Sequence, residues 1–323
     1  MVGQKLKLIQ MLKHIIMNPF KIFFIAIISL TLVQCESDDD DITIIEPLSD
    51  FQFLIEGAVV TFNGTVSEGT SSYTWDFGDG NTSTEEDPIH AYDIGEFDVS
   101  FTATSEKGTF TETKTVTILP SFEILLTGGP AKPEGKSWKL KAAYTAGIEG
   151  AGYTVNNDLR IDIGSFDNLL SAVGLGASYE DTFTFVHDGQ YKVDNKDGNS
   201  LMGLVYAFIE RAADIREVSA DQVNIPLANV AYTPTDGNWS VNEEDFTVTS
   251  FNINTGAPEQ PTFTGQTQLL TSEYFGIKEA NGFVIIKDIT ENTMNVAMSL
   301  GVVEHPDFYT FPAIMFHLSF EVN

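Results

Sequence analysis

The stretch that decides the fold spans residues 73–108 and reads YTWDFGDGNTSTEEDPIHAYDIGEFDVSFTATSEKG. Its later part, FDVSFTAT at 97–104, alternates apolar and polar residues, which predicts a β-strand with one buried face. Gly78–Asn81 predicts a turn, because glycine adopts positive φ without strain. Trp75 and Phe77 stand two residues apart and share one face of a strand, so we expect both in the core of a β-sandwich.

This stretch resembles the PKD domain, an immunoglobulin-like β-sandwich. The matching residues are Trp75-Asp76-Phe77-Gly78-Asp79-Gly80, Pro88, His90, Tyr92 and Gly95. The resemblance covers nearly all of residues 42–120, and Pro120 marks its end. It implies a module without chemistry of its own that holds the next domain away from a membrane.

Two aspartates in the predicted turn are open to two interpretations. Asp76 and Asp79 could bind calcium together with turn carbonyl groups. Alternatively, their carboxylates accept hydrogen bonds from the backbone of the turn itself, which is the interpretation we favour. We also expect His90 to be a structural histidine rather than a ligand.

The second domain, residues 121–323, reads mainly as strands separated by turns. VHDGQ and NKDGN are typical of hairpin turns, and such a succession predicts an antiparallel sandwich or barrel. The strand-like segments are SWKLKA, DTFTFVHDGQYKV, FTVTSFNI, QTQLLTS, GFVIIKDIT, TMNVAMSL and AIMFHLSFEV. Two helices are predicted within this pattern. One follows Ser165 as its N-cap and ends at Gly174, and an amphipathic one runs from about Leu201 to Val218 and packs on the sheet.

Three segments of this domain resemble the lipocalin-like domains of Bacteroidetes surface lipoproteins. They are GKSWKL, DTFTFVHDGQYKVDN and FVIIKDITENTMNVAM, with Asp181, Phe183, Phe185, Gly189 and Tyr191 matching a characteristic hairpin. The resemblance implies that Trp138 fills the core. The predicted fold is therefore mainly β: an immunoglobulin-like PKD sandwich followed by an antiparallel β-barrel or sandwich with two short helices.

The N-terminal segment predicts export. Residues 1–34 contain four lysines and no acidic residue, and the apolar run Ile22–Val33 suits a signal-peptide core but is too short to span a bilayer. Translation starts at Met1 or, as the more typical signal MNPFKIFF suggests, at Met17. Leu32-Val33-Gln34-Cys35 resembles a bacterial lipobox, which implies that Cys35 carries the lipid anchor.

An acidic linker, residues 35–41, follows and includes Asp38–Asp41. Acidic residues at this position resemble the surface-export signal of Bacteroidetes lipoproteins. We therefore expect a protein anchored in the outer membrane and facing the cell exterior.

Composition excludes several classes of function. A formal net charge of -29 disfavours a nucleic-acid partner, since phosphate binding needs basic patches. A single cysteine excludes an intrachain disulfide and a cysteine zinc cluster. Neither Gly-x-Ser-x-Gly nor His-Glu-x-x-His occurs, so we predict a protein that is not an enzyme and needs no cofactor other than the calcium considered above.

A PKD domain joined to such a β domain on a lipoprotein resembles glycan-associated surface lipoproteins of polysaccharide-foraging bacteria. Gly147–Gly152 matches the Gly-x-x-Gly-x-Gly loop of several of them. We therefore predict a non-catalytic protein that binds a neutral polysaccharide, with Tyr153, Trp239 and Tyr274 as candidates for stacking on sugar rings. Two alternatives stay open: a lipocalin-like container for an apolar ligand, and a structural subunit of an outer-membrane uptake complex with a transporter as partner.

Lipidation of Cys35 can be tested directly. Cells that express the chain are grown with a clickable fatty-acid probe, and the wild-type protein should be labelled, whereas Cys35→Ser should not. An unlabelled wild-type protein would remove the basis for the predicted membrane anchor.

Overall fold

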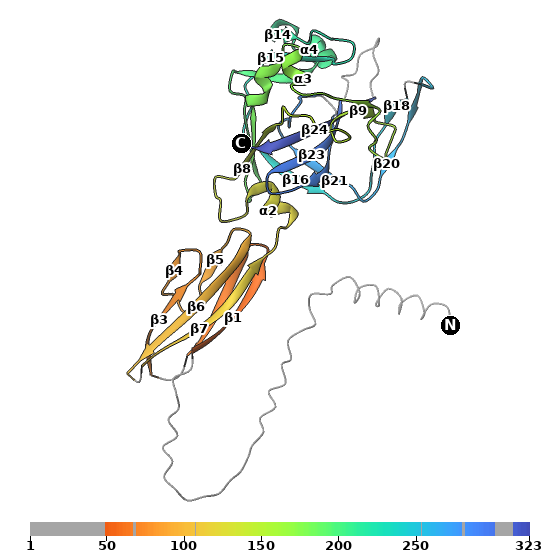
Figure 1. Cartoon of the computed structure of the whole chain (residues 1–323). Coiled ribbons are helices and arrows are strands. Elements are labelled where there is room, and N and C mark those ends of the chain that lie inside the picture. Colours follow the sequence, from red (N-terminus) through yellow and green to blue (C-terminus); the bar gives the residue numbers. More distant parts are fainter. Residues whose placement is uncertain (1–48, 67–68, 107, 253, 280–281, 301–312) are drawn as a thin grey trace, which may run out of the picture. The chain divides into compact units, whose positions relative to one another are not determined.

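The computed structural model describes residues 49–66, 69–106, 108–252, 254–279, 282–300 and 313–323 (Figure 1). The predicted signal peptide (1–34), the acidic linker (35–41) and Cys35 lie outside these residues. Within them, no helix combines the length and the apolar character that crossing a membrane requires. The described chain is mainly β, as predicted, with a sandwich followed by a barrel.

The N-terminal sandwich consists of two antiparallel sheets. One has the order β1-β2-β5 and the other has the order β4-β3-β6-β7. The strands are β1 (Ser49–Glu56), β2 (Val59–Val66), β3 (Thr70–Asp76), β4 (Thr82–Ser83), β5 (Ile89–Ala91), β6 (Gly95–Ser105) and β7 (Gly108–Ile118).

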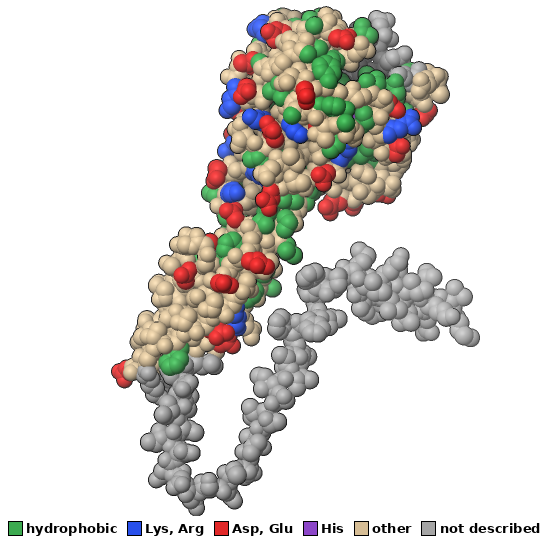
Figure 2. All heavy atoms as spheres, viewed as in Figure 1, with side chains coloured by type: hydrophobic (Ala, Val, Ile, Leu, Met, Phe, Trp, Pro, Cys, Tyr) green, Lys and Arg blue, Asp and Glu red, His purple; other side chains and the backbone are tan. Residues whose placement is uncertain are grey.

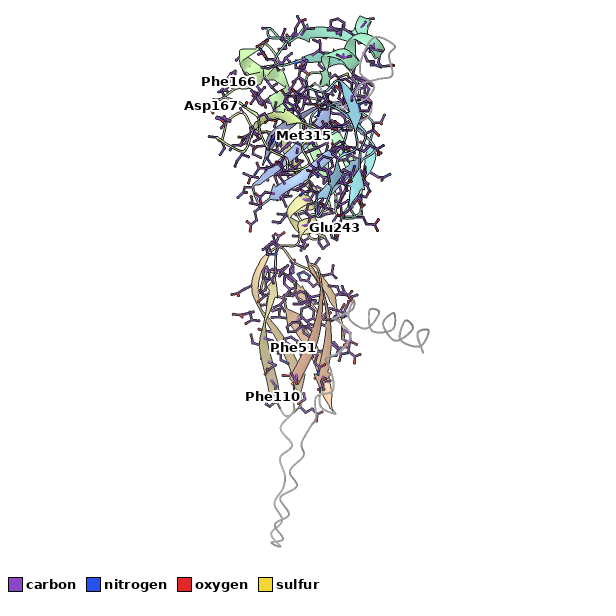
Figure 3. All side chains as sticks on the ribbon, turned by 90° about the vertical axis from the view of Figure 1, so that its right-hand side faces the viewer. Phe51, Phe110, Phe166, Asp167, Glu243 and Met315 are labelled. Carbon is purple, nitrogen blue, oxygen red and sulfur yellow. The ribbon has the colours of Figure 1, made fainter. Side chains whose placement is uncertain are left out.

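Aromatic side chains fill the space between the two sheets, as predicted for Trp75 and Phe77. Trp75 is fully buried and stacks on Phe101 with ring centroids 4.3 Å apart, and its indole N–H donates to the carbonyl oxygen of Glu85 at 3.0 Å. Figure 3 places Phe51 in this core. Gly78 is required in the turn, because its φ is 77° and a Cβ there would lie 2.6 Å from the carbonyl oxygen of Asp98.

A short helix, α2 (Phe122–Thr127), follows the sandwich. The Ser121 hydroxyl caps it by accepting from the amide of Ile124 at 3.3 Å, and Gly128 ends it in the left-handed conformation. Ile124 belongs to the core of the sandwich and Leu126 to the core of the second domain. The sequence analysis did not predict this helix.

The second domain is a closed antiparallel barrel of eight strands. Each strand pairs with the next barrel strand along the chain, and the first, β8, also pairs with the last, β24. The strands are β8 (Lys136–Leu140), β11 (Thr182–Phe185), β12 (Gln190–Asp194), β16 (Gly237–Asn242), β21 (Thr267–Thr271), β22 (Val284–Ile289), β23 (Thr293–Leu300) and β24 (Ile314–Val322).

Three insertions interrupt this up-and-down order. Between β8 and β11 lie β9 (Gly150–Tyr153), β10 (Ile163–Gly164), α3 (Leu169–Ala172) and the 3-10 helix η1 (Gly176–Glu180). Between β12 and β16 lie β13 (Asn199–Gly203), α4 (Leu204–Glu210), the 3-10 helix η2 (Ala212–Asp214), β14 (Ile215–Val218) and β15 (Leu227–Ala231). Between β16 and β21 lie β17 (Phe246–Thr247), β18 (Ser250–Asn252), β19 (Ala257–Glu259) and β20 (Thr262–Phe263).

The predicted helices differ from the observed ones. The helix expected from Leu201 to Val218 is wrong at both ends: only α4 is α-helical, and it lies between strands β13 and β14. Leu201 pairs with Asn229 on β15, so strand pairing with a distant segment overrides the local helical pattern. The first predicted helix is shorter than expected, because α3 begins after Asn168 rather than after Ser165.

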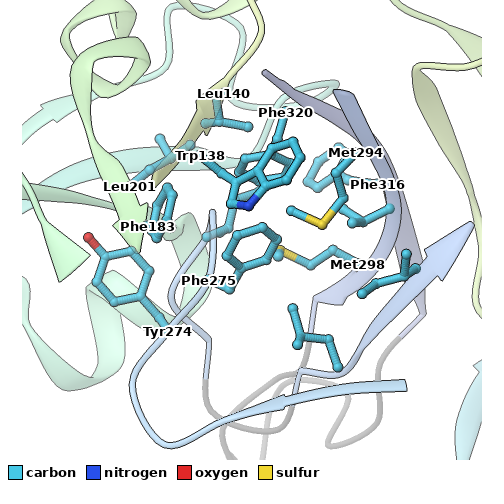
Figure 4. Close-up of a cluster of buried hydrophobic side chains, with 14 of the residues drawn as sticks. Trp138, Leu140, Phe183, Leu201, Tyr274, Phe275, Met294, Met298, Phe316 and Phe320 are labelled. Atoms are coloured by element: carbon cyan, nitrogen blue, oxygen red, sulfur yellow. The ribbon is translucent and has the colours of Figure 1, made fainter. Parts of the chain in front are cut away.

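The barrel interior is a packed core rather than an open container. Phe275, from the loop after β21, stacks on Phe320 with centroids 4.3 Å apart and meets Phe183 edge-on at 5.1 Å (Figure 4). Trp138 is fully buried beside them, as predicted, and its indole N–H donates to the carbonyl oxygen of Leu126 at 2.9 Å. A barrel of eight strands is just wide enough for such filling.

Phe275 should therefore be a large contributor to the stability of the barrel. Phe275→Ala leaves a cavity among aromatic rings and should lower the free energy of unfolding by about 3–5 kcal/mol in urea titrations. Phe208→Ala is the matched control, because Phe208 is 53% exposed, and it should cost no more than about 0.5 kcal/mol. Similar losses for the two variants would contradict the role of Phe275 as the plug of the barrel.

Candidate functional site

The three aromatic residues predicted to stack on sugars do not form one surface. Tyr274 is only 8% exposed, and its hydroxyl donates to Ser200 at 2.7 Å within the barrel core. Trp239 on β16 is half-buried against the same core, and its indole N–H donates to the carbonyl oxygen of Val186 at 2.7 Å. Tyr153 on β9 lines a separate cavity of about 360 Å³. The structure thus gives Trp239 and Tyr274 structural roles.

Asp76 and Asp79 hold their turn. Each accepts a hydrogen bond at 2.9 Å from an amide two residues ahead, Gly78 and Asn81 respectively. His90 lies 2.7 Å from the second carboxylate oxygen of Asp79 and stacks on Phe77, which fits the predicted structural role of this histidine. Across the part of the chain that the structure describes, no group of three or more His, Cys, Asp or Glu residues is arranged to hold a metal ion.

The strongest candidate site is a cavity of about 210 Å³ at one end of the barrel, the barrel-end cavity. Leu140, Leu170 and Phe316 are among the apolar side chains that line it. Ile163 and Phe166 also belong to its lining, yet they are 62% and 51% exposed, so apolar surface continues from the cavity to its rim. Figure 3 shows Phe166 on the loop before α3, at the periphery of the domain.

The cavity exists because the chain leaves the barrel after β8. The amide of Lys141 still donates to the carbonyl oxygen of Ser319 on β24 at 2.9 Å. From there the chain turns away, and it returns as β9, which pairs with residues 314–317 of the same edge of β24. The space between the departing and returning segments is covered by α3 and by β10.

Two glycines bring β9 close to its neighbours. A Cβ at Gly150 would lie 2.2 Å from the carbonyl oxygen of Ile163, and one at Gly152 would lie 2.4 Å from that of Arg160. Both positions belong to the Gly147–Gly152 loop singled out in the sequence. The spacing of these glycines therefore serves close backbone approach, and it positions Glu149 against the cavity.

One wall of the barrel-end cavity carries a buried carboxylate. Glu149 is 8% exposed; its Oε1 accepts from the Ser319 hydroxyl at 2.5 Å, and its Oε2 accepts from the amide of Thr145 at 2.7 Å. Acceptance at both oxygens suits the ionised form of the acid. Sequence reasoning missed Glu149, and the only signal was its place within the glycine loop.

His317, next to Ser319's strand neighbour on β24, is also buried in this wall. Its Nδ1 lies 3.2 Å from Lys287 Nζ, and an ammonium group only donates, so Nδ1 is the unprotonated nitrogen of a neutral ring. Burial, with the Lys287 charge as a second cause, lowers the pKa of His317 to about 4. Burial also lowers the pKa of Lys287.

A second buried acid lies outside the cavity. Asp181, which opens the hairpin motif seen in the sequence, is 2% exposed. Burial, and then the charges of Asp197 and Asp194, raise the pKa of its carboxyl to about 8. It is therefore protonated at neutral pH and acts as a neutral core residue.

Residues 45–119 match the family model described as PKD domain. The N-terminal sandwich is a PKD domain. The chain is 28% identical over 138 residues to collagenase ColQ1 of Bacillus cereus (strain Q1), covering 36% of this chain and 14% of that protein. It is 40% identical over 68 residues to the pre-pro-metalloprotease PrtV of Vibrio cholerae serotype O1 (strain M66-2), covering 20% of this chain and 7% of that protein.

Solved structures similar to the chain include two PKD domains. The PKD1 domain of the Vibrio cholerae metalloprotease PrtV is 37% identical, with 23% of this chain and 98% of that chain covered and a TM-score of 0.22. The PKD1 domain of Vibrio anguillarum Epp is 35% identical, with 23% and 95% covered and the same TM-score of 0.22.

The pKa of His317 predicts how stability depends on pH. The folded protein keeps the ring neutral down to about pH 4, whereas the unfolded chain takes up a proton near 6.5. Stability from this residue is therefore complete above 6.5 and is lost as pH falls, by up to about 1.4 kcal/mol per pH unit. Between pH 7 and pH 5 the wild type should lose roughly 2 kcal/mol more unfolding free energy than His317→Gln. Parallel pH curves for the two proteins would refute this.

Proposed function

We propose that the chain is an exported, lipid-anchored, non-catalytic binding protein whose barrel-end cavity takes a small apolar ligand. The PKD domain serves as a spacer between the membrane anchor at Cys35 and the barrel. Among the predicted functions, this is the container for an apolar ligand, in a restricted form, because the ligand occupies one end of the barrel and not its filled centre.

The barrel-end cavity is the observation that carries this proposal. Its volume of about 210 Å³ exceeds the roughly 150 Å³ at which a dry apolar cavity already holds benzene. Leu140, Leu170 and Phe316 offer apolar contact, and burial of each ligand methylene should contribute about 0.8 kcal/mol. The exposed Ile163 and Phe166 at the rim give an apolar ligand a route from the surface. In Figure 2, apolar side chains also gather on one area of this domain.

Binding of a neutral polysaccharide receives less support from the geometry. Sugar stacking needs a ring face open to solvent. Tyr274 is buried in the core, and Trp239 packs against that core with its N–H bound to Val186. Only Tyr153 of the three candidates lines a cavity. Glycan capture, and assembly with an outer-membrane transporter, are therefore outcomes to be tested rather than the leading proposal.

The proposed location outside the cell rests on two supports. One is the predicted lipidation of Cys35 followed by an acidic linker. The other is the PKD domain, which also occurs in a protein named as a collagenase, whose named substrate lies outside cells. Basic side chains lie scattered among acidic ones on the face shown in Figure 2, which agrees with the absence of a nucleic-acid partner from the proposal.

Displacement of an apolar fluorescent dye tests the proposed function. The purified full chain should bind 1-anilinonaphthalene-8-sulfonate or N-phenyl-1-naphthylamine, and Ala142→Phe, which places a ring in the cavity lining, should weaken binding at least about tenfold. Ala146→Phe is the matched control, because Ala146 is exposed and lies outside the lining. Equal binding by the two variants, or retardation of the protein by a β-glucan gel without dye binding, would overturn the proposal.

A further inference from the structure

We infer that the ligand of the barrel-end cavity carries an ammonium head group that pairs with Glu149. This inference rests on the proposed function and adds the chemical class of the ligand: a small apolar amine rather than a fatty acid. It follows from three features of the cavity wall, which are the free acceptor capacity of Glu149, the engagement of the nearby lysines and the aromatic residues around the carboxylate.

Glu149 has acceptor capacity that the protein does not use. A carboxylate offers about four lone-pair sites. The Ser319 hydroxyl and the amide of Thr145 account for one site on each oxygen. These two contacts also fix the orientation of the carboxylate, which is almost fully buried and belongs to the cavity lining.

No cation of the chain neutralises this carboxylate directly. None of the ion pairs found between described residues includes Glu149. Lys287 is close enough to feel its charge, but its ammonium group donates to the carbonyl oxygen of Ile148 at 3.3 Å and faces His317. Lys141 donates to the Thr145 hydroxyl at 3.3 Å. A buried charge needs a partner, and a cationic ligand would supply one.

Aromatic residues surround the same space. Tyr144, Phe166, Tyr179 and Phe316 all belong to the cavity lining. Ring faces attract cations electrostatically, most strongly where water is excluded. The lining thus combines a carboxylate and aromatic rings for the head group with leucine and isoleucine side chains for an apolar tail.

The arrangement also discriminates against other head groups. A ligand carboxylate would meet Glu149 as a like charge in a poorly solvated site, and the chain as a whole carries a formal charge of -29. A hydroxyl can donate one hydrogen bond to Glu149 but leaves its charge unpaired. The expected order of affinity is therefore amine, then alcohol, then carboxylate.

Three ligands with the same tail test this order: hexylamine, 1-hexanol and hexanoate, each titrated against a bound apolar dye on the full chain. Hexylamine should bind at least about tenfold more tightly than 1-hexanol, a difference of about 1.4 kcal/mol. Hexanoate should displace the dye least. If hexanoate binds as well as hexylamine, the head-group inference fails while the apolar cavity stands, and if none of the three displaces the dye, the proposed function itself fails.

Glu149→Gln keeps the shape and removes the charge. It should lower hexylamine affinity about tenfold, to the level of 1-hexanol, and leave 1-hexanol affinity within about twofold. Glu243→Gln, an identical change at an exposed position outside the cavity lining, is the control and should alter neither (Figure 3). Retained 1-hexanol binding shows that the Glu149 variant is folded, and a tenfold amine preference that survives in it would overturn the inference.

Discussion

The pairing of the first barrel strand with the last one is the constraint on which the second domain depends. β8 meets β24 over only three residue pairs, from Leu140 with Phe320 to Trp138 with Val322. The other half of that edge of β24 belongs to β9. One strand edge is thus shared by two segments of the same insertion, and the space where one departs and the other arrives becomes the barrel-end cavity. Closure and cavity have the same origin.

Filling of the barrel limits where a ligand can bind. Phe275 comes from a loop rather than a strand, and it completes a cluster with Phe183, Phe320 and Trp138. Because protein interiors are close-packed, these rings leave no room for a ligand at the centre. The remaining volume lies at the end, where the insertion between β8 and β11 and the one between β12 and β16 both contribute lining residues. Side chains from strands give the barrel its stability, and insertions give it its recessed surface.

The cavity wall carries a stability cost that the fold accommodates. Glu149 is taken out of water, and the Ser319 hydroxyl and one amide only partly compensate for its lost hydration. His317 is held neutral in the same wall. Buried polar groups of this kind lower stability relative to apolar replacements, and their concentration beside an apolar cavity sets this end of the barrel apart from the rest of the core.

The sequence by itself determined the local features. Alternation and turn residues specified the PKD domain around Trp75, the β11–β12 hairpin and the last three barrel strands, because strand faces and glycine turns depend on neighbouring residues. Tertiary structure alone decided that Leu201 lies in a strand, that Tyr274 faces the core, and that Glu149 meets Ser319 across 170 positions of sequence. Such contacts depend on which distant strands pair, and local periodicity contains no information about that choice.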